Sequence, residues 1–214
     1  MDDRTHQQGQ PSAVSLLPLS GEPLPLDLIN TTYIKGGVRG RLMDALTTPA
    51  DLDDWLASHR ERLGVGLELT GAADGAHLTE FRRLREAVRA LTEARVAGRE
   101  PDAGDVSVVN AAARFAVQWQ ELAPGAGFAA RVRRMEGDPR WAALGEVAVR
   151  AVTLLAGPDA ERVRACPAPG CVLYFLKGQA HREWCTAGCG NRVRVARHSR
   201  RAAGGDVPAE VGQS

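Results

Sequence analysis

Apolar residues recur every three or four positions along two long stretches of the chain, which is the spacing of residues on one face of a helix. The first stretch covers residues 77–97 and ends before Gly98, and the second covers residues 139–156 and ends at Gly157. Glycine is common where helices end, so both boundaries support the prediction. We expect the apolar stripes to form the core of a domain rather than to line a cofactor site, because burial alone demands this spacing.

Shorter segments complete the expected body. A helix is predicted from Thr48 to the residue before Gly64, because threonine can cap a helix and the proline after it suits the first turn. A further helix is predicted over residues 104–117. Residues 119–122 and 128–133 are typical of a β-hairpin around a Pro-Gly-Ala-Gly turn. The chain is therefore predicted to be mainly α, with a helical N-terminal domain that includes one small β-hairpin.

A glycine-rich segment with basic residues follows the first residues of that domain. It contains Lys35, Gly36, Gly37, Arg39, Gly40 and Arg41. Loops that cradle phosphate have the patterns GxxxxGK[ST] or GxGxxG between a strand and a helix, and neither pattern is present here. The segment is predicted to be a flexible basic loop, and no nucleotide site is expected.

Basic residues are concentrated toward the C-terminal end, although the formal net charge of the whole protein is only +1. Residues 1–161 carry 18 Lys and Arg against 23 Asp and Glu. Residues 162–201 carry nine basic residues, one acid (Glu183) and all four cysteines. This asymmetry suggests an acidic body with an appendage that binds a polyanion, and the alternative is a solvated basic segment.

The four cysteines form two close pairs, Cys166 with Cys171 and Cys185 with Cys189, and 13 residues separate the pairs. This spacing is typical of tetrahedral zinc ligation, in which both pairs hold the same ion. The second pair enters a basic segment that is predicted to be helical, and a helix N-terminus favours thiolates. Four thiolates leave no open position for water, so we expect one structural Zn²⁺ rather than a catalytic ion.

Other uses of these cysteines remain open at the level of sequence. Two disulfides would need an oxidising compartment, an iron–sulfur cluster also takes four cysteines, and unliganded thiols are a third alternative. His181 and His198 could act as ligands, but with four cysteines available they are expected at the surface or facing phosphate. Tyr174, Phe175 and Trp184 lie between the two pairs and are predicted to form the small core that such a module needs.

The segment after Cys189 is predicted to be an amphipathic basic helix. At 100° per residue, arginines and a histidine share one side, whereas Val193 and Ala196 fall on another side that can pack on the metal module. Arginine forks suit bidentate contacts with phosphate and guanine. A solvated arginine-rich face is the alternative, but beside a zinc module this pattern favours nucleic-acid binding.

The same residues carry a resemblance to a known family. Residues 189–192 read CGNR, follow Trp184-Cys185 and precede the run Val-Arg-Val-Ala-Arg-His. Together with the upstream cysteine pair and residues 174–176, Tyr-Phe-Leu, this segment resembles the CGNR zinc finger. Residues 26–31, Leu-Asp-Leu-Ile-Asn-Thr, and the helices after them resemble the domain that precedes this finger. That domain is called ABATE and is described as a "putative stress-induced transcription regulator".

The resemblance covers about residues 24–202 and implies a bacterial, zinc-containing, DNA-binding transcription regulator. It places the metal ligands on the four cysteines, in a small C-terminal treble-clef-like zinc finger that ends in a basic helix. Asp27 and Asn30 match the start motif of the N-terminal domain, where they would cap and bond internally or form a ligand pocket for a small-molecule signal. The candidate nucleic-acid contacts are Arg182, Arg192, Arg194, Arg197, His198, Arg200 and Arg201.

These observations give an expected organisation and function. We expect a disordered N-terminus over residues 1–20, a helical ABATE-like domain over 21–157, a CGNR-type finger over 158–203 and a disordered tail over 204–214. Duplex DNA is the expected partner, and because one finger makes few base contacts, useful specificity predicts a homodimer or a further partner. An RNA-binding or protein-interaction module with a purely structural zinc and a thiol redox sensor are the alternatives.

Several function classes are disfavoured by the sequence. It contains no HExxH, no GxSxG and no Cys–His nucleophile pair outside the cysteine cluster, so an enzyme is not expected. No apolar run approaches the roughly 18 residues of a membrane helix, so no membrane partner is expected. Residues 1–4 are polar and lack the features of a secretory signal. We therefore expect a cytoplasmic, nucleoid-associated protein.

Overall fold

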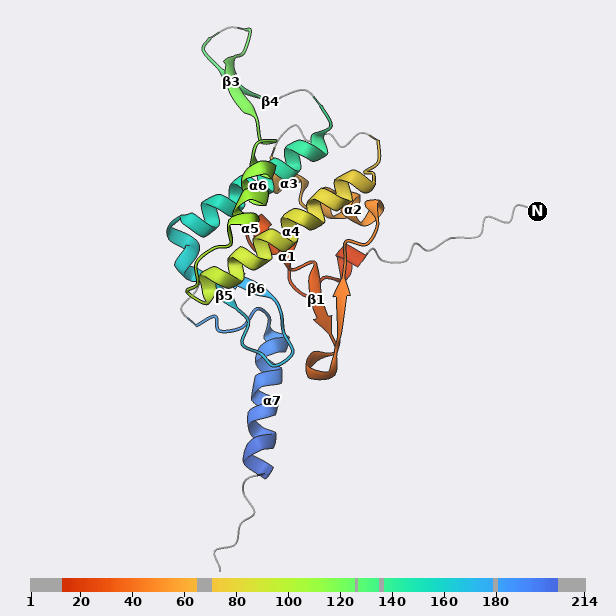
Figure 1. The fold of residues 1–214 in the computed structure, drawn as a ribbon, viewed down its shortest axis with the longest axis vertical. Helices are drawn as coiled ribbons and strands as arrows, with labels where there is room; N and C mark the ends of the chain where they lie inside the picture. Colours follow the sequence, from red (N-terminus) through yellow and green to blue (C-terminus); the bar gives the residue numbers. More distant parts are fainter. Residues whose placement is uncertain (1–12, 65–70, 126, 135–136, 179–180, 204–214) are drawn as a thin grey trace, which may run out of the picture.

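In the computed structural model, the described residues form a helical body with two small hairpins, followed by a third hairpin and a long C-terminal helix (Figure 1). The structure describes residues 13–64, 71–125, 127–134, 137–178 and 181–203. The main helices of the body are α1 (Leu24–Ile29), α4 (Gly75–Val96), α5 (Ala103–Ala113) and α6 (Pro139–Ala156). The short α1 is buried along its whole length and packs against both α4 and α6. The core of the body therefore lies where these helices meet.

The two longest helices of the body confirm the helices that the apolar spacing predicted. Helix α4 begins at a capping box in which Asp74 accepts hydrogen bonds from the backbone N–H groups of Ala76 and His77. It ends before Gly98, which has a left-handed φ of 65°. Helix α6 spans residues 139–156, as predicted, with Asp138 as its N-cap. The apolar side chains on the inner faces of both helices lie in one continuous core.

The predicted helix from Thr48 is interrupted at His59. It is divided into α2 (Pro49–Ser58) and α3 (Arg60–Leu63). The carbonyl of Trp55 accepts from Nδ1 of His59 at 2.7 Å, while the backbone N–H of His59 donates to Leu56 instead. The buried imidazole stacks on the indole of Trp55, with ring centroids 4.4 Å apart. A side chain thus takes the place of a helical hydrogen bond, which the spacing of apolar residues does not reveal.

The glycine-rich segment is ordered as the turn of a hairpin that the sequence did not predict. Strands β1 (Thr32–Lys35) and β2 (Arg41–Asp44) pair in antiparallel register around the 3-10 helix η2 (Gly37–Arg39). Gly36 has a φ of 99°, and a Cβ on Gly40 would lie 2.3 Å from the carbonyl oxygen of Lys35. The glycines therefore serve a tight turn rather than a flexible loop.

The second hairpin confirms a prediction, although its boundaries and those of the preceding helix shift. Strands β3 (Gln118–Leu122) and β4 (Ala130–Arg134) pair in antiparallel register, and the hairpin projects from the body at the top of Figure 1. Helix α5 ends at Ala113 rather than at residue 117. The described part of the body thus contains two small hairpins, whereas the sequence indicated one.

Part of the N-terminal segment that was predicted to be disordered is ordered. Residues 13–16 form the 3-10 helix η1 (Ala13–Leu16), and Val14 and Leu17 pack against the core, so the predicted disorder does not extend over residues 13–20. Residues 1–12 and the predicted tail over 204–214 lie outside the described residues. Within the described part of the chain, no helix has both the length and the apolar character to cross a membrane.

A buried ion pair joins α4 to the first hairpin. Nη1 and Nη2 of Arg85 donate to the two carboxylate oxygens of Asp44 at 2.6 and 2.8 Å, and Nη1 also donates to Oγ1 of Thr31 at 3.2 Å. Burial alone would raise the pKa of Asp44, but hydrogen bonds from Arg85 and from the backbone N–H of Leu46 outweigh it, and the pKa is lowered. Asp44 therefore stabilises the fold in its ionised form.

Asp44→Asn is expected to lower the free energy of unfolding by about 2 kcal/mol or more, because it leaves the buried guanidinium of Arg85 with a weaker partner. The wild-type carboxylate stabilises the fold above its unfolded-state pKa of 3.8, and this contribution is lost as pH falls through the lower folded-state pKa. The difference between the two proteins should therefore shrink below about pH 4. Urea unfolding of both proteins above and below pH 4 measures this stability difference, and Asp54→Asn, at an exposed position, is the control. A difference that stays constant with pH would contradict the assignment.

Candidate metal centre and nucleic-acid interface

The first cysteine pair lies at the tip of the third hairpin. The 3-10 helix η3 (Pro158–Arg162) leads from α6 into strands β5 (Val163–Ala165) and β6 (Tyr174–Leu176), which pair in antiparallel register. Cys166 follows β5 directly and donates its backbone N–H to Leu173, and the N–H of Cys171 donates to Ala168. Gly170 has a φ of 69°, which lets the chain reverse just before Cys171. The pair therefore occupies a compact metal knuckle, residues 166–171.

The second cysteine pair lies at the start of helix α7 (Ala187–Ala203). Cys189 is in its first turn, where its backbone N–H donates to Oγ1 of Thr186, and Cys185 precedes the helix by two residues. A Cβ on Gly190 would lie 3.0 Å from the indole of Trp184, so the glycine allows close packing of that ring. The knuckle, the third hairpin and the first turn of α7 thus surround one possible metal position. This is the arrangement of the predicted treble-clef-like finger.

The four Sγ atoms lie within 4.8 Å of one another. The sulfurs of Cys171 and Cys185 are 3.7 Å apart, and those of Cys185 and Cys189 are 3.5 Å apart. A tetrahedral ion with bonds of about 2.3 Å holds its sulfurs about 3.8 Å apart, whereas a disulfide needs about 2.05 Å. All four thiols are free. The cluster therefore fits one structural zinc and not two disulfides, and among the described residues it contains no histidine.

The clustered thiols change one another's ionisation. Hydrogen bonds from Cys171 and Cys185 lower the pKa of Cys166 to about 2, and the bond to Cys166 raises the pKa of Cys171 to about 12. The pKa of Cys185 is raised as well, for the same reason. Without an ion, one thiolate is thus stabilised at the expense of its neighbours. A divalent cation removes this competition, because it stabilises all four thiolates together. The N-terminus of α7 also favours the thiolate form of the sulfurs near it.

Aromatic side chains surround the cluster as predicted, with one exception. Phe175 and the half-buried Trp184 pack with the cysteines in an apolar cluster that also contains Tyr33 and Ala45 from the N-terminal body. Tyr174 points instead into the core of the body, where the guanidinium of Arg89 lies 5.8 Å from its ring. The core of the finger is therefore shared with the first hairpin and is larger than the sequence of the finger alone suggests.

Two arginines among the predicted nucleic-acid contacts bind within the protein. Arg192 donates through Nη1 to the carbonyl of Pro169 at 2.9 Å, and its Nη2 lies 3.7 Å from Sγ of Cys189. Arg182 pairs with Glu22 at 2.5 Å, donates to the carbonyl of Cys185 and lies 4.7 Å from the ring of Phe175. Both guanidinium groups therefore stabilise the finger, and their contact with nucleic acid stays a prediction.

Asp27 and Asn30 form internal hydrogen bonds, which is the first of the two roles that the sequence left open for them. Asn30 donates through Nδ2 to the carbonyl of Tyr174 at 2.8 Å and accepts the N–H of the same residue at 3.0 Å. Asp27 accepts the N–H of Glu22 and forms an ion pair with Arg62 at 2.5 Å. Asn30 therefore completes the hydrogen bonds of β6 from the other domain, and Asp27 fixes the start of α1.

The predicted outer face of α7 is exposed. Arg194, Arg197 and His198 point to solvent, whereas Val193 and Ala196 on the inner side are half-buried. The side chain of Arg194 donates to Oδ1 of Asn191, one turn earlier, and the side chains of Arg197 and His198 have no hydrogen bond or ion pair among the described residues. The helix projects from the body (Figure 1). The side chains of Arg200 and Arg201 lie outside the described residues.

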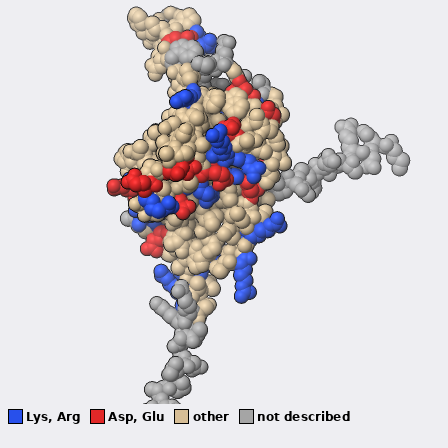
Figure 2. Space-filling model, in the orientation of Figure 1, with Lys and Arg blue, Asp and Glu red and all other residues tan. Residues whose placement is uncertain are grey.

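A second group of basic side chains lies beside the metal knuckle and was not predicted as part of the interface. Arg39 lies in the turn of the first hairpin, and Lys35 and Arg41 lie at the strand ends beside it; all three are exposed, and within the described chain their side chains have no hydrogen bond or ion pair. A Cβ on Gly170 of the knuckle would lie 2.6 Å from the carbonyl oxygen of Gly37, so the two turns touch. Figure 2 shows basic side chains projecting in this part of the molecule. The only sign of this second basic group in the sequence was the basic composition of residues 35–41.

The fold and the cysteine cluster together define a helical domain followed by a small metal-binding finger. The ABATE family, described as "Putative stress-induced transcription regulator", matches residues 22–158, and the CGNR zinc finger matches residues 162–202. The chain belongs to the ABATE family, and the order of its two segments confirms the resemblance in the sequence. These are regulator and zinc-finger families, not enzyme families. Among curated proteins, none matches the chain.

Proposed function

We propose that this protein is a transcription regulator that binds duplex DNA through α7. The observation that carries the proposal is the exposed row of Arg194, Arg197 and His198 on a helix anchored at its first turn by the cysteine cluster. Membership of a transcription-regulator family supports the regulatory role. Arginine forks on such a helix suit both phosphate oxygens and guanine edges.

The dimensions of α7 support this role. A helix of 17 residues extends about 26 Å, and the major groove of B-DNA, about 12 Å wide, admits one helix. In this arrangement Lys35, Arg39 and Arg41 lie beside the start of the helix and reach the phosphates at the edge of the groove. The first hairpin then contributes positioning contacts, while the outer face of α7 contributes the contacts to bases.

The proposal predicts binding to duplex DNA that weakens steeply with salt. With four to six phosphates neutralised, log K should fall with log salt at a slope of roughly −4 to −5. Titration of labelled genomic fragments with the zinc-loaded protein, at a series of salt concentrations, measures this slope. Single-stranded RNA is added as a competitor in the same assay. Failure to bind duplex at low salt, a slope near zero, or efficient displacement by RNA would each overturn the proposal.

We further infer that the DNA-bound form contains two copies of the chain. A single finger presents few side chains to base edges, and useful discrimination in a genome requires more contacts than one helix supplies. The helical domain is then the dimerisation or sensing part. The stoichiometry of the complex in the same titration distinguishes one copy from two, and a strict 1:1 complex on specific fragments would refute this inference.

A further inference from the structure

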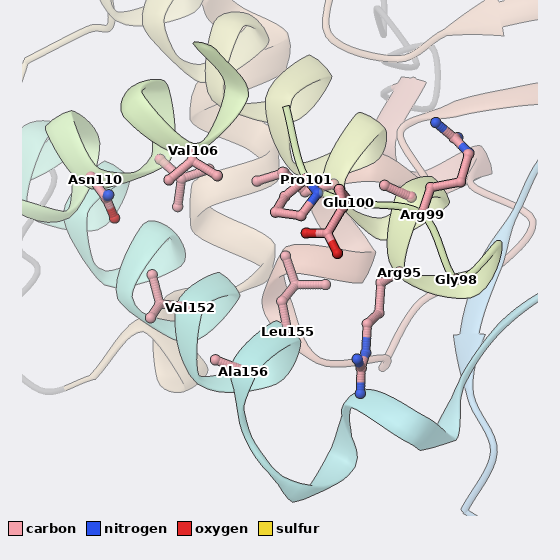
Figure 3. Close-up of a pocket in the computed structure, with 13 residues that line it drawn as sticks. Arg95, Gly98, Arg99, Glu100, Pro101, Val106, Asn110, Val152, Leu155 and Ala156 are labelled. Atoms are coloured by element: carbon pink, nitrogen blue, oxygen red, sulfur yellow. The ribbon is translucent and has the colours of Figure 1, made fainter. Parts of the chain in front are cut away.

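A cavity of about 490 Å³ opens between α4, α5 and α6 in the body (Figure 3). Its walls are mainly aliphatic, with Leu91 from α4, Val106 and Val109 from α5, and Val152 and Leu155 from α6. Leu91 and Val109 are buried core residues, so the cavity reaches the edge of the hydrophobic core. Its volume lies within the range of about 300–1,000 Å³ that is typical of sites for small molecules.

The polar groups of the cavity are few and nearly balanced in charge. Arg95 and Glu100 carry opposite charges, and Asn110 provides an amide; all three side chains lack a hydrogen bond or ion pair within the described chain. Arg99 at the rim already pairs with Glu93 at 3.2 Å. Figure 3 shows Asn110 and Arg95 at opposite ends of the site, with Leu155 between them. Such a lining favours a mainly apolar ligand without net charge, because the opposite charges of Arg95 and Glu100 offset each other and give little net attraction to an ion that would lose its hydration.

We propose that this cavity binds an uncharged, mainly apolar small molecule with one hydrogen-bonding group, for which Asn110 is the partner. The further inference that this ligand is a regulatory signal rests on the proposed function. The site differs from the pocket expected at Asp27 and Asn30, whose side chains are bound internally. Its aliphatic walls provide affinity, and the amide orients the ligand.

The cavity lies next to the elements that hold the zinc finger. Helix α6 packs against η3 and continues through it into β5, which leads directly to Cys166. Helix α4, which carries the wall residue Leu91, also carries Arg89, whose Nη1 donates to the carbonyl of Val172 at 3.0 Å. Arg89 thus reaches the residue after Cys171. A ligand that separates α4 from α6 would therefore act on both connections to the metal knuckle.

The test uses an uncharged fluorescent probe, N-phenyl-1-naphthylamine, with the zinc-loaded full-length protein. Its anionic counterpart, 8-anilinonaphthalene-1-sulfonate, has the same aromatic frame with an added sulfonate. We expect the uncharged probe to bind at least about tenfold more tightly than the sulfonate, a difference of about 1.4 kcal/mol. Absence of binding by the uncharged probe, or tighter binding of the sulfonate, would overturn the proposal.

Two tryptophan variants on α6 locate the binding site. Val152→Trp places a large ring in the cavity, whereas Val149→Trp places the same ring on the same helix outside the lining. Val152 and Val149 are 42% and 40% exposed, so both variants should fold, which thermal unfolding verifies. We expect Val152→Trp to weaken probe binding at least about tenfold and Val149→Trp to change it less than about twofold. Equal binding by both variants would overturn the site.

These results are independent of the DNA assays. Probe binding that is blocked by Val152→Trp supports the cavity as a ligand site even if the protein fails to bind duplex DNA, in which case only the regulatory proposal falls. Probe binding that Val152→Trp does not affect overturns the site even if DNA binding is established. Asn110→Leu, which removes the amide while keeping the volume similar, should weaken a hydrogen-bonding probe such as 1-naphthol more than naphthalene.

Discussion

Cys185→Ser is expected to abolish stoichiometric zinc binding and to unfold the finger, while the helices of the body persist. Its Sγ atom lies within 3.7 Å of two other cysteine sulfurs, and a neutral hydroxyl cannot replace a thiolate ligand. Structural zinc contributes about 10–16 kcal/mol of binding free energy, which is as large as the stability of a whole domain. Metal analysis of the purified protein and near-UV circular dichroism measure the two losses.

A buried residue beside the cluster provides the control. Ala168 lies between Cys166 and Cys171, is 3% exposed and is not a ligand, so Ala168→Ser adds a hydroxyl to the same surroundings without removing a sulfur. This variant should keep one zinc per chain. If Cys185→Ser also kept one zinc per chain and an unchanged near-UV spectrum, the assignment of the metal centre would be wrong.

Replacing Arg194 and Arg197 together with alanine should weaken binding to duplex DNA by about tenfold or more and should reduce the salt slope by about two units. Both side chains are exposed on the outer face of α7, and neither contacts the cysteine cluster, so zinc content and thermal stability should stay unchanged. Fluorescence anisotropy with labelled fragments, at several salt concentrations, measures affinity and slope in one experiment.

A second double variant separates position from charge. Arg83→Ala with Arg114→Ala removes the same two positive charges from exposed sites on α4 and at the end of α5. This protein should bind DNA almost as the wild type does. If both double variants lose affinity to the same extent, net charge rather than α7 governs binding, and the proposed interface is incorrect.

Local signals in the sequence were sufficient for much of the fold and for the metal centre. Helices α4 and α6 follow directly from the spacing of their apolar residues and from the caps at Asp74, Asp138 and Gly98. The cysteine cluster follows from two short spacings, because each pair is brought together by a single turn. The first hairpin was missed because its turn, residues 36–40, was interpreted from composition alone as a loop.

The roles of individual arginines depended on contacts between distant residues. Arg182 and Arg197 look alike in the sequence, yet Arg182 pairs with Glu22, 160 residues away, and Arg197 is exposed. The sequence pattern places both in a basic segment but does not reveal which charge has an internal partner. The same reason applies to Asn30, whose partner, the backbone of Tyr174, is 144 residues away.

The apolar cluster shared by Phe175 and Tyr33 means that the unit of folding does not coincide with the boundary between the two families. A hybrid regulator made by exchanging the finger at residue 158 would expose Tyr33 and Ala45 and would give the new finger an unmatched partner surface. If α7 binds DNA as proposed, transfer of its specificity to another chain would therefore require the first hairpin to move together with the finger. For the same reason, binding of zinc at the C-terminal end also stabilises structure near the N-terminal end of the chain.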